Sequence, residues 1–251
     1  MKLLVLNPNT TGAVTELLRR HVAAAAGNGV TLCAATARFG AAYIADELSY
    51  AVAGHAALDA YAAFVAAQPG DVPDAVLLGC FGDPGVAALR QLAGVPVVGL
   101  AEAAMRQAAA LGPYAIVTGG AAWAPMLRRL ALGLGLAEGL LGIHTVAPSG
   151  AELAADPERA LALLRDACTR AAKGVNSVVL GGAGLAGMAA QLAADVPVPV
   201  IDSVVAGTEV LLQMAREAEN GAMLRSAATW SGLSPELLRA IKETPRRPKF
   251  P

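Results

Sequence analysis

One cysteine stands where a thiol could exchange protons with a substrate. Cys80 lies in the run Leu78–Gly85, which reads Leu-Gly-Cys-Phe-Gly-Asp-Pro-Gly, between a short apolar stretch and a segment of helical period. The N-terminus of a following helix would lower the pKa of such a thiol and favour the thiolate. The pattern therefore predicts that Cys80 is a general acid and base. Asp83 could serve Cys80 as a base, but its position before Pro84 favours an N-cap of the following helix.

The remaining cysteines and the histidines do not indicate a second reactive centre. Cys33 and Cys168 lie in apolar segments and are expected to be small buried residues. Three cysteines that are far apart, with no Cys-x-x-Cys pair, argue against a disulfide framework and against a zinc site. His21, His55 and His144 have no carboxylate or cysteine at ligand spacing, so no metal site is expected.

Hydrogen-bond donors follow several of the predicted strands. Asn9 and Thr10 follow the first strand, and Thr118 ends a strand in the second half of the chain. Backbone N–H groups near Phe81 and Ala183 would lie in two glycine-rich turns. Donors of this kind could hold the negative charge that develops on an enolate oxygen. The alternative is that these residues only form turns and helix caps.

Short apolar strands alternate with longer segments of helical period, which predicts the class α/β with parallel sheets buried on both faces. The predicted strands are residues 3–6, 30–36, 75–78, 95–99, 115–118, 141–146, 177–180 and 198–202. The predicted helices are residues 15–26, 49–67, 84–93, 122–132, 157–172, 185–193 and 204–217.

An internal repeat indicates two similar Rossmann-like domains. With an offset of 102 residues, Val76–Gly82 lies over Val178–Gly184, and each copy continues through a helix to a Val-Pro strand. The alternative is that any two βαβ units look alike. Duplication predicts one domain from residues 1–98 with 205–251 and another from residues 99–204. Ligands of open α/β sheets bind at the carboxyl ends of strands, so both glycine turns would face one cleft.

Composition excludes several classes of partner. The chain has 251 residues, 55% of them hydrophobic, and a formal net charge of -1. Its one concentrated basic run is Arg246, Arg247 and Lys249, so nucleic acid is not an expected partner. No uninterrupted apolar run reaches the roughly 18 residues of a membrane span, and no signal peptide is evident, so a cytoplasmic location is expected. Motifs for nucleotide binding are also absent.

Four motifs together resemble the Asp/Glu/hydantoin racemase superfamily, with hydantoin and allantoin racemases as the nearest branch. They are Asn7–Thr11, Gly79–Gly85, Val117–Thr118 and Val179–Gly184. The resemblance spans nearly the whole chain. It implies two α/β domains related by a pseudo-twofold axis, no cofactor, a homo-oligomer, and two cysteines that face each other across the α-carbon of a small substrate.

The sequence departs from that pattern at Gly182, where the superfamily has its second cysteine. We interpret the chain as an isomerase that uses Cys80 on a hydantoin or amino-acid-like compound. The alternatives are a one-thiol lyase, such as a decarboxylase of a malonate-like acid, and a binding homologue without turnover. Arg38 and Tyr43 lie in a loop that could grip the substrate.

Overall fold

Two parallel sheets form the centre of the molecule. The computed structural model describes residues 1–146, 156–217 and 226–243. The strands are β1 (Lys2–Asn7), β2 (Thr31–Thr36), β3 (Ala75–Leu78), β4 (Val97–Gly99), β5 (Tyr114–Gly119), β6 (Leu140–Val146), β7 (Ser177–Gly181) and β8 (Val200–Asp202). One sheet has the order β2-β1-β3-β4 and the other β6-β5-β7-β8, with every neighbouring pair parallel. The predicted α/β class is confirmed.

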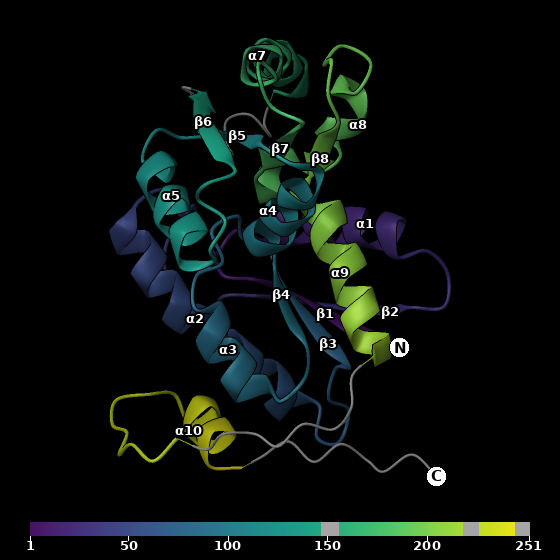
Figure 1. Cartoon of the computed structure of the whole chain (residues 1–251). Coiled ribbons are helices and arrows are strands. Elements are labelled where there is room, and N and C mark those ends of the chain that lie inside the picture. Colours follow the sequence, from purple (N-terminus) through teal and green to yellow (C-terminus); the bar gives the residue numbers. More distant parts are fainter. Residues whose placement is uncertain (147–155, 218–225, 244–251) are drawn as a thin grey trace.

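Helices connect the strands and cover the sheets (Figure 1). They are α1 (Gly12–Ala26), α2 (Glu47–Ala67), α3 (Val86–Ala93), α4 (Leu100–Leu111), α5 (Trp123–Gly133), α7 (Pro157–Ala171), the 3-10 turn η1 (Ala183–Leu185), α8 (Met188–Leu192), α9 (Ser203–Glu217) and α10 (Pro235–Lys242). The inner strands are apolar at successive positions because helices on both faces exclude water from them. Leu3 to Leu6 and Ala75 to Leu78 are all fully buried.

The two sheets have the same strand order, as two copies of one unit would have. Each sheet packs against the helix that follows the last strand of the other sheet. Helix α4 follows β4 but packs on β7, and α9 follows β8 but packs on α1 and β3. The two helices lie side by side between the sheets (Figure 1). This exchange supports our proposal that residues 1–98 with 205–251 form one domain and residues 99–204 the other.

Several elements differ from the sequence prediction. Helices α4 and α10 were not predicted, because α4 begins directly after β4 without a loop and α10 is one short segment. Helix α3 begins at Val86 and not at Pro84. The predicted helix 185–193 is divided into η1 and α8, because Gly187 has a left-handed backbone with φ of 80°.

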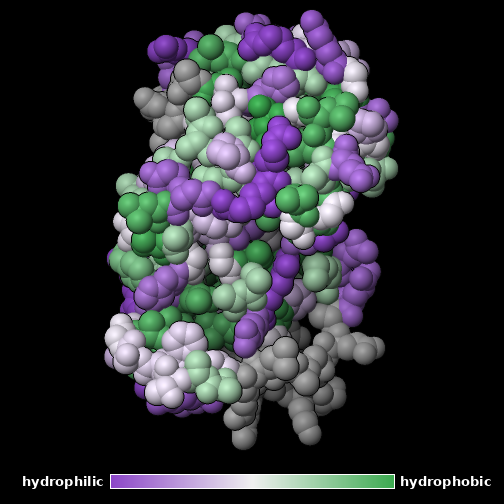
Figure 2. Space-filling view, turned by 60° about the vertical axis from the view of Figure 1, so that its left-hand side comes forward, coloured by the Kyte–Doolittle hydropathy of each residue, from purple (hydrophilic) through white to green (hydrophobic). Residues whose placement is uncertain are grey.

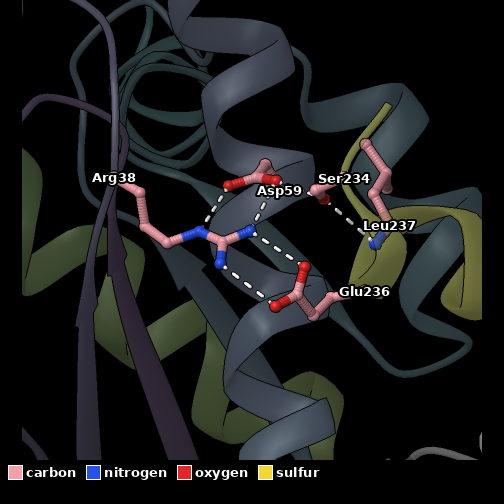
Figure 3. Close-up of polar contacts among 5 residues, drawn as sticks. All are labelled: Arg38, Asp59, Ser234, Glu236 and Leu237. Carbon is pink, nitrogen blue, oxygen red and sulfur yellow. Dashed lines mark hydrogen bonds and ion pairs between the residues drawn. The ribbon is translucent and has the colours of Figure 1, made fainter. Parts of the chain in front are cut away.

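A polar cluster fastens α10 to α2 and to the loop after β2 (Figure 3). Arg38, which follows β2, donates through Nε and Nη2 to the two carboxylate oxygens of Asp59 on α2, both at 2.8 Å. Its guanidinium also contacts Glu236 on α10, and Ser234 Oγ donates to Asp59 at 2.6 Å. Arg38 therefore holds structure together, and the expectation that it grips a substrate is wrong.

The surface matches the composition. On the face drawn in Figure 2, hydrophilic and hydrophobic residues alternate in small groups, and a band of hydrophilic side chains crosses its middle. Within the described ranges, no helix is long and apolar enough to cross a membrane. The basic run Arg246, Arg247 and Lys249 lies outside the described residues.

Candidate active site

A cavity lies where strands from both sheets end. The volume of this cavity is about 60 Å³. Its described lining comes from the ends of β5 and β7, the turns after β1, β3, β5 and β7, the loop before α2 and the first turns of α1 and α5. These residues are Asn9, Val14, Tyr43, Ile44, Gly79, Cys80, Phe81, Thr118, Gly119, Trp123, Gly181, Gly182, Ala183, Gly184 and Leu185. This is the edge at which parallel α/β sheets bind their ligands.

The structure brings together most of the residues predicted for the site. Those that line the cavity are Asn9, Cys80, Phe81, Thr118, Gly182 and Ala183. Thr10 is not among the described lining residues. Its backbone N–H donates to Ala41 O at 3.1 Å, and the neighbouring Thr11 Oγ1 donates to Ala42 O at 2.7 Å. Thr10 therefore helps to fix the loop that carries Tyr43.

Cys80 is held at the wall of the cavity with only 7% of its surface exposed. Burial raises the pKa of its thiol well above the ordinary value, and the nearby Asp83 carboxylate raises it further. The expectation of a lowered pKa is therefore wrong. Helix α3 begins six residues after Cys80, behind the left-handed Gly85, so its N-terminus does not stabilise a thiolate.

Asp83 caps a helix, but not the helix predicted. It has a φ of 58°, and its carboxylate accepts from Ala101 N at 2.9 Å and from Glu102 N at 2.7 Å, both in the first turn of α4. A Cβ on Gly99 would lie 2.2 Å from the Asp83 carboxyl carbon, so the carboxylate occupies the space of a missing side chain. Burial raises the pKa of Asp83 to about 7.

The turn that carries Cys80 is fixed by contacts from both halves of the chain. Tyr50 Oη donates to Gly82 O at 2.9 Å. Trp123 of α5 packs on Gly82, where a Cβ would lie 2.4 Å from the indole ring. The ring of Phe81 crosses to the second sheet and packs on Gly181, where a Cβ would lie 2.2 Å from it.

Asn9 is oriented so that its amide nitrogen is available to a ligand. Asn9 Oδ1 accepts from Asn7 Nδ2 and from Thr11 N, both at 2.9 Å, and Asn9 N donates to Asn7 Oδ1 at 3.1 Å. These bonds fix the direction of the Asn9 amide. Asn9 Nδ2 donates to no other residue in the described part of the chain.

Further donors lie on the two glycine turns. Among described residues, the backbone N–H groups of Phe81 and Ala183 have no hydrogen-bond partner. Gly182 N donates to Ser203 Oγ at 3.3 Å. The backbone of Gly182 has a φ of 147°, a value that residues other than glycine rarely adopt. The cavity therefore combines one thiol with several donors for an oxygen that gains negative charge.

The charge of the cavity is also informative. No Lys, Arg, His, Asp or Glu is among the described residues that line it. No cluster of three potential metal ligands occurs in the described ranges either. The apolar part of the wall includes Ile44, Leu185 and Trp123, which the sequence analysis did not single out. The glycine pair after Thr118 was the signal that could have indicated Trp123, because it follows a predicted strand and parallel strands end at the same edge.

Fold and cavity define a class of protein: two parallel α/β units of equal topology with a thiol at the edge that they share. A profile of the Asp/Glu/Hydantoin racemase family matches residues 3–211. The chain therefore belongs to the Asp/Glu/hydantoin racemase family, as the motifs predicted, and is an enzyme of the racemase class.

Individual relatives agree with this assignment. The chain is 32% identical to a hydantoin racemase of Paenarthrobacter aurescens over 213 residues, which cover 84% of this chain and 89% of the relative. It is 31% identical to a hydantoin racemase of Pseudomonas sp. (strain NS671) over 212 residues, or 83% and 84% of the two chains. The structure of an allantoin racemase from Klebsiella pneumoniae superposes with a TM-score of 0.86 at 29% identity. The superposition covers 94% of this chain and 98% of the allantoin racemase.

An arylmalonate decarboxylase shares the fold alone, with a TM-score of 0.59 at 18% identity. The superposition covers 94% of this chain and 97% of the decarboxylase.

Proposed function

We propose that this chain racemises a small cyclic amide of the hydantoin type by proton transfer at the carbon next to a carbonyl. Cys80 exchanges the proton, and the carbonyl oxygen accepts hydrogen bonds while it carries the enolate charge. The donors for that oxygen are Asn9 Nδ2, the Thr118 hydroxyl and the N–H groups of Phe81 and Ala183. The names of the relatives support this class of substrate.

The observation that carries the proposal is the thiol of Cys80 in a cavity whose described wall has donors but no charged side chain. A buried carboxylate without a cationic partner is costly, because uncharged donors offset only part of its lost hydration. An amino acid or a malonate-like acid would bring such a carboxylate. A hydantoin is uncharged near neutral pH and offers carbonyl and N–H groups that match the available donors. The wall therefore favours a hydantoin over the other two compounds.

The test follows each enantiomer of 5-methylhydantoin, 5-benzylhydantoin and allantoin by chiral chromatography, against the uncatalysed rate. We expect racemisation by the wild type and a loss of at least about 10²-fold in Cys80→Ser, because the serine hydroxyl is a much weaker acid than the thiol and gives almost no anion to take the α-proton. Cys33→Ser is the matched control, since Cys33 lies on β2 away from the cavity. Racemisation that survives in Cys80→Ser contradicts the assignment.

Gly182 favours a second candidate, a one-thiol lyase. With no side chain at Gly182, Cys80 could protonate one face of an enediolate after loss of carbon dioxide from a disubstituted malonate. Gas release with a product of single handedness would support the lyase. Binding of hydantoins without exchange of the α-proton would instead indicate a homologue that binds and does not turn over.

A further inference from the structure

Inversion at a carbon needs a proton-transfer group on each face, and Gly182 supplies none. Among the described residues that line the cavity, the ionisable side chains are those of Cys80 and Tyr43. We propose that Tyr43 is the second acid–base residue and serves the face of the α-carbon opposite Cys80. This inference rests on the proposed racemase function and names the group that completes it.

Both side chains are carried by the first half of the chain, but they lie beside the strand ends of different sheets, because Tyr43 extends from the loop between β2 and α2 to the end of β5. Cys80 stands at the end of β3, in the first sheet. The Tyr43 hydroxyl lies at the end of β5, in the second sheet, where it is 4.0 Å from the position of a Cβ on Gly120. Because β5 pairs with β7, with Thr118 opposite Gly181, this hydroxyl lies at the same sheet edge as Gly182. A substrate between the two sheets would have Cys80 on one side and Tyr43 on the other.

The loop before α2 holds Tyr43 in this position. It is fixed by the bonds from Thr10 and Thr11 to Ala41 and Ala42, and by the burial of Ile44, which is 3% exposed. A capping box at the start of α2, between Asp46 and Ser49, fixes the other end of the loop. A phenol held in one place loses little conformational entropy on reaching the transition state.

The other polar groups of the described wall cannot take this part. The amide of Asn9 does not titrate, and the hydroxyl of Thr118 is too weak an acid to leave an alkoxide near neutral pH. Both remain suited to hydrogen bonding of the enolate oxygen. Tyr43 is the group that can give up a proton and recover it.

Cys80 and Tyr43 together hold one acidic proton before and after each turnover, so the number of protons is conserved. In one direction the thiolate of Cys80 takes the α-proton, the C–H electron pair becomes the enolate, and the Tyr43 hydroxyl delivers its proton to the opposite face. The products are the other enantiomer, the Cys80 thiol and the Tyr43 phenolate. The reverse direction starts from that state, and exchange of protons with water interconverts the two forms of the enzyme.

The experiment measures racemisation and α-proton exchange separately, with each enantiomer of 5-methylhydantoin in D₂O. We expect Tyr43→Phe to lose at least about 10²-fold in racemisation. It should still exchange the α-proton of one enantiomer with retention, because Cys80 can remove and return a proton on its own face. Cys80→Ser should show the reciprocal pattern and exchange the other enantiomer. Tyr114→Phe is the control, since its hydroxyl contacts Leu136 O near the opposite end of β5.

Three results would overturn the assignment of Tyr43 as the second acid–base residue. Racemisation by Tyr43→Phe within about tenfold of the wild type overturns the inference. So does a folded Tyr43→Phe that loses exchange of both enantiomers equally, because a merely structural role would produce that result. If the wild type itself neither racemises nor exchanges any compound tested above, the proposed function fails, and this inference fails with it. Folding of every variant is checked by its melting temperature.

Discussion

The protonation of Cys80 is set by its surroundings more than by its place in the sequence. The thiol is buried, and Asp83, three residues later, adds a negative charge beside it as its own carboxyl ionises around pH 7. Both effects disfavour the thiolate, so the resting residue holds its proton at neutral pH. A resting thiol is suited to donate a proton, and the thiolate that starts catalysis forms in a small fraction of molecules.

This protonation predicts an alkaline rise in activity. Because the pKa of the Cys80 thiol is raised, the thiolate fraction and with it kcat should increase with pH, by about tenfold per unit between pH 7 and pH 9. Asp83→Asn removes the neighbouring charge and should move the profile toward lower pH. The measurement is kcat for 5-methylhydantoin from pH 6 to pH 10. A flat profile would show that Cys80 does not have to ionise.

Gly182 has a backbone that disfavours any side chain. Its φ is 147°, and a Cβ would lie 3.3 Å from Leu185 Cγ. Gly182→Ala and Gly182→Cys should therefore each lower the free energy of unfolding by about 1–3 kcal/mol in urea titrations. If the thiol faces Cys80, Gly182→Cys should racemise faster than Gly182→Ala, since a positioned acid–base group contributes about 10²–10⁴-fold. Equal rates in the two variants would mean that a thiol at this position does not reach the substrate.

At the scale of elements, each half of the chain caps the helix after its last strand with an aspartate, but in different ways. Asp202 precedes α9 and accepts from Val204 N at 2.8 Å and, through its other oxygen, from Gly187 N at 2.7 Å. The corresponding helix α4 has Gly99 at this position, and Asp83 supplies the carboxylate from the turn of Cys80. The cap of α4 thus fixes the turn that carries Cys80.

The cluster around Arg38 predicts how α10 is retained. Arg38→Met leaves the carboxylate of Asp59, whose side chain is 4% exposed, with Ser234 as its remaining polar partner within the cluster. The side chain of Arg38 is 43% exposed, so the pair is only partly shielded from water. We therefore expect Arg38→Met to lower the free energy of unfolding by about 2 kcal/mol, between the values for exposed and buried ion pairs. Urea unfolding at pH 7 measures it, with Arg19→Met, which breaks an exposed pair with Glu16, as the control. An equal effect of both changes would contradict the structural role of the cluster.

The acid side of the stability profile gives a second measure of this cluster. The hydrogen bonds from Arg38 lower the pKa of Asp59 below its ordinary value. The stability that the pair contributes is therefore present above the unfolded pKa, near pH 4, and is lost as the pH falls through the lower folded value. In Arg38→Met this part of the acid sensitivity should be smaller than in the wild type.

At the scale of the whole molecule, two kinds of contact join the halves around the cavity. Glu47 on α2 and Arg129 on α5 form an exposed ion pair with two hydrogen bonds. Trp123 on the same helix α5 is buried, packs on Gly82 and meets Tyr50 edge to face at 6.5 Å between ring centroids. Apolar packing, rather than charge, should therefore determine how the halves are held.

A comparison of two variants tests this expectation. Trp123→Ala should lower the free energy of unfolding by about 3–5 kcal/mol and reduce racemisation, because it removes both a buried ring and the support of the Cys80 turn. Arg129→Gln should leave stability nearly unchanged, since water and salt screen an exposed pair. Urea titrations and racemisation rates of both variants provide the measurement. A larger effect of Arg129→Gln would reverse the assignment.

The sequence alone determined the class of the fold, the family and the position of Cys80. Apolar runs with the period of strands, helices between them and the repeat of the glycine turns are local features, and they need no knowledge of distant contacts. The motif Gly79–Gly85 placed the thiol after a strand, and parallel strands all end at one edge. This is why residues as far apart as Asn9, Cys80 and Thr118 could be expected at one site.

Only the tertiary structure decided which partners these residues have. Asp83 caps a helix that begins 17 residues later, Arg38 binds α2 and α10 instead of lining the cavity, and Thr10 supports the loop of Tyr43. The pKa of the Cys80 thiol is raised because the chain folds over it, which periodicity does not reveal. Partner choice and burial depend on packing between segments that are distant in sequence, so they follow from the folded chain as a whole.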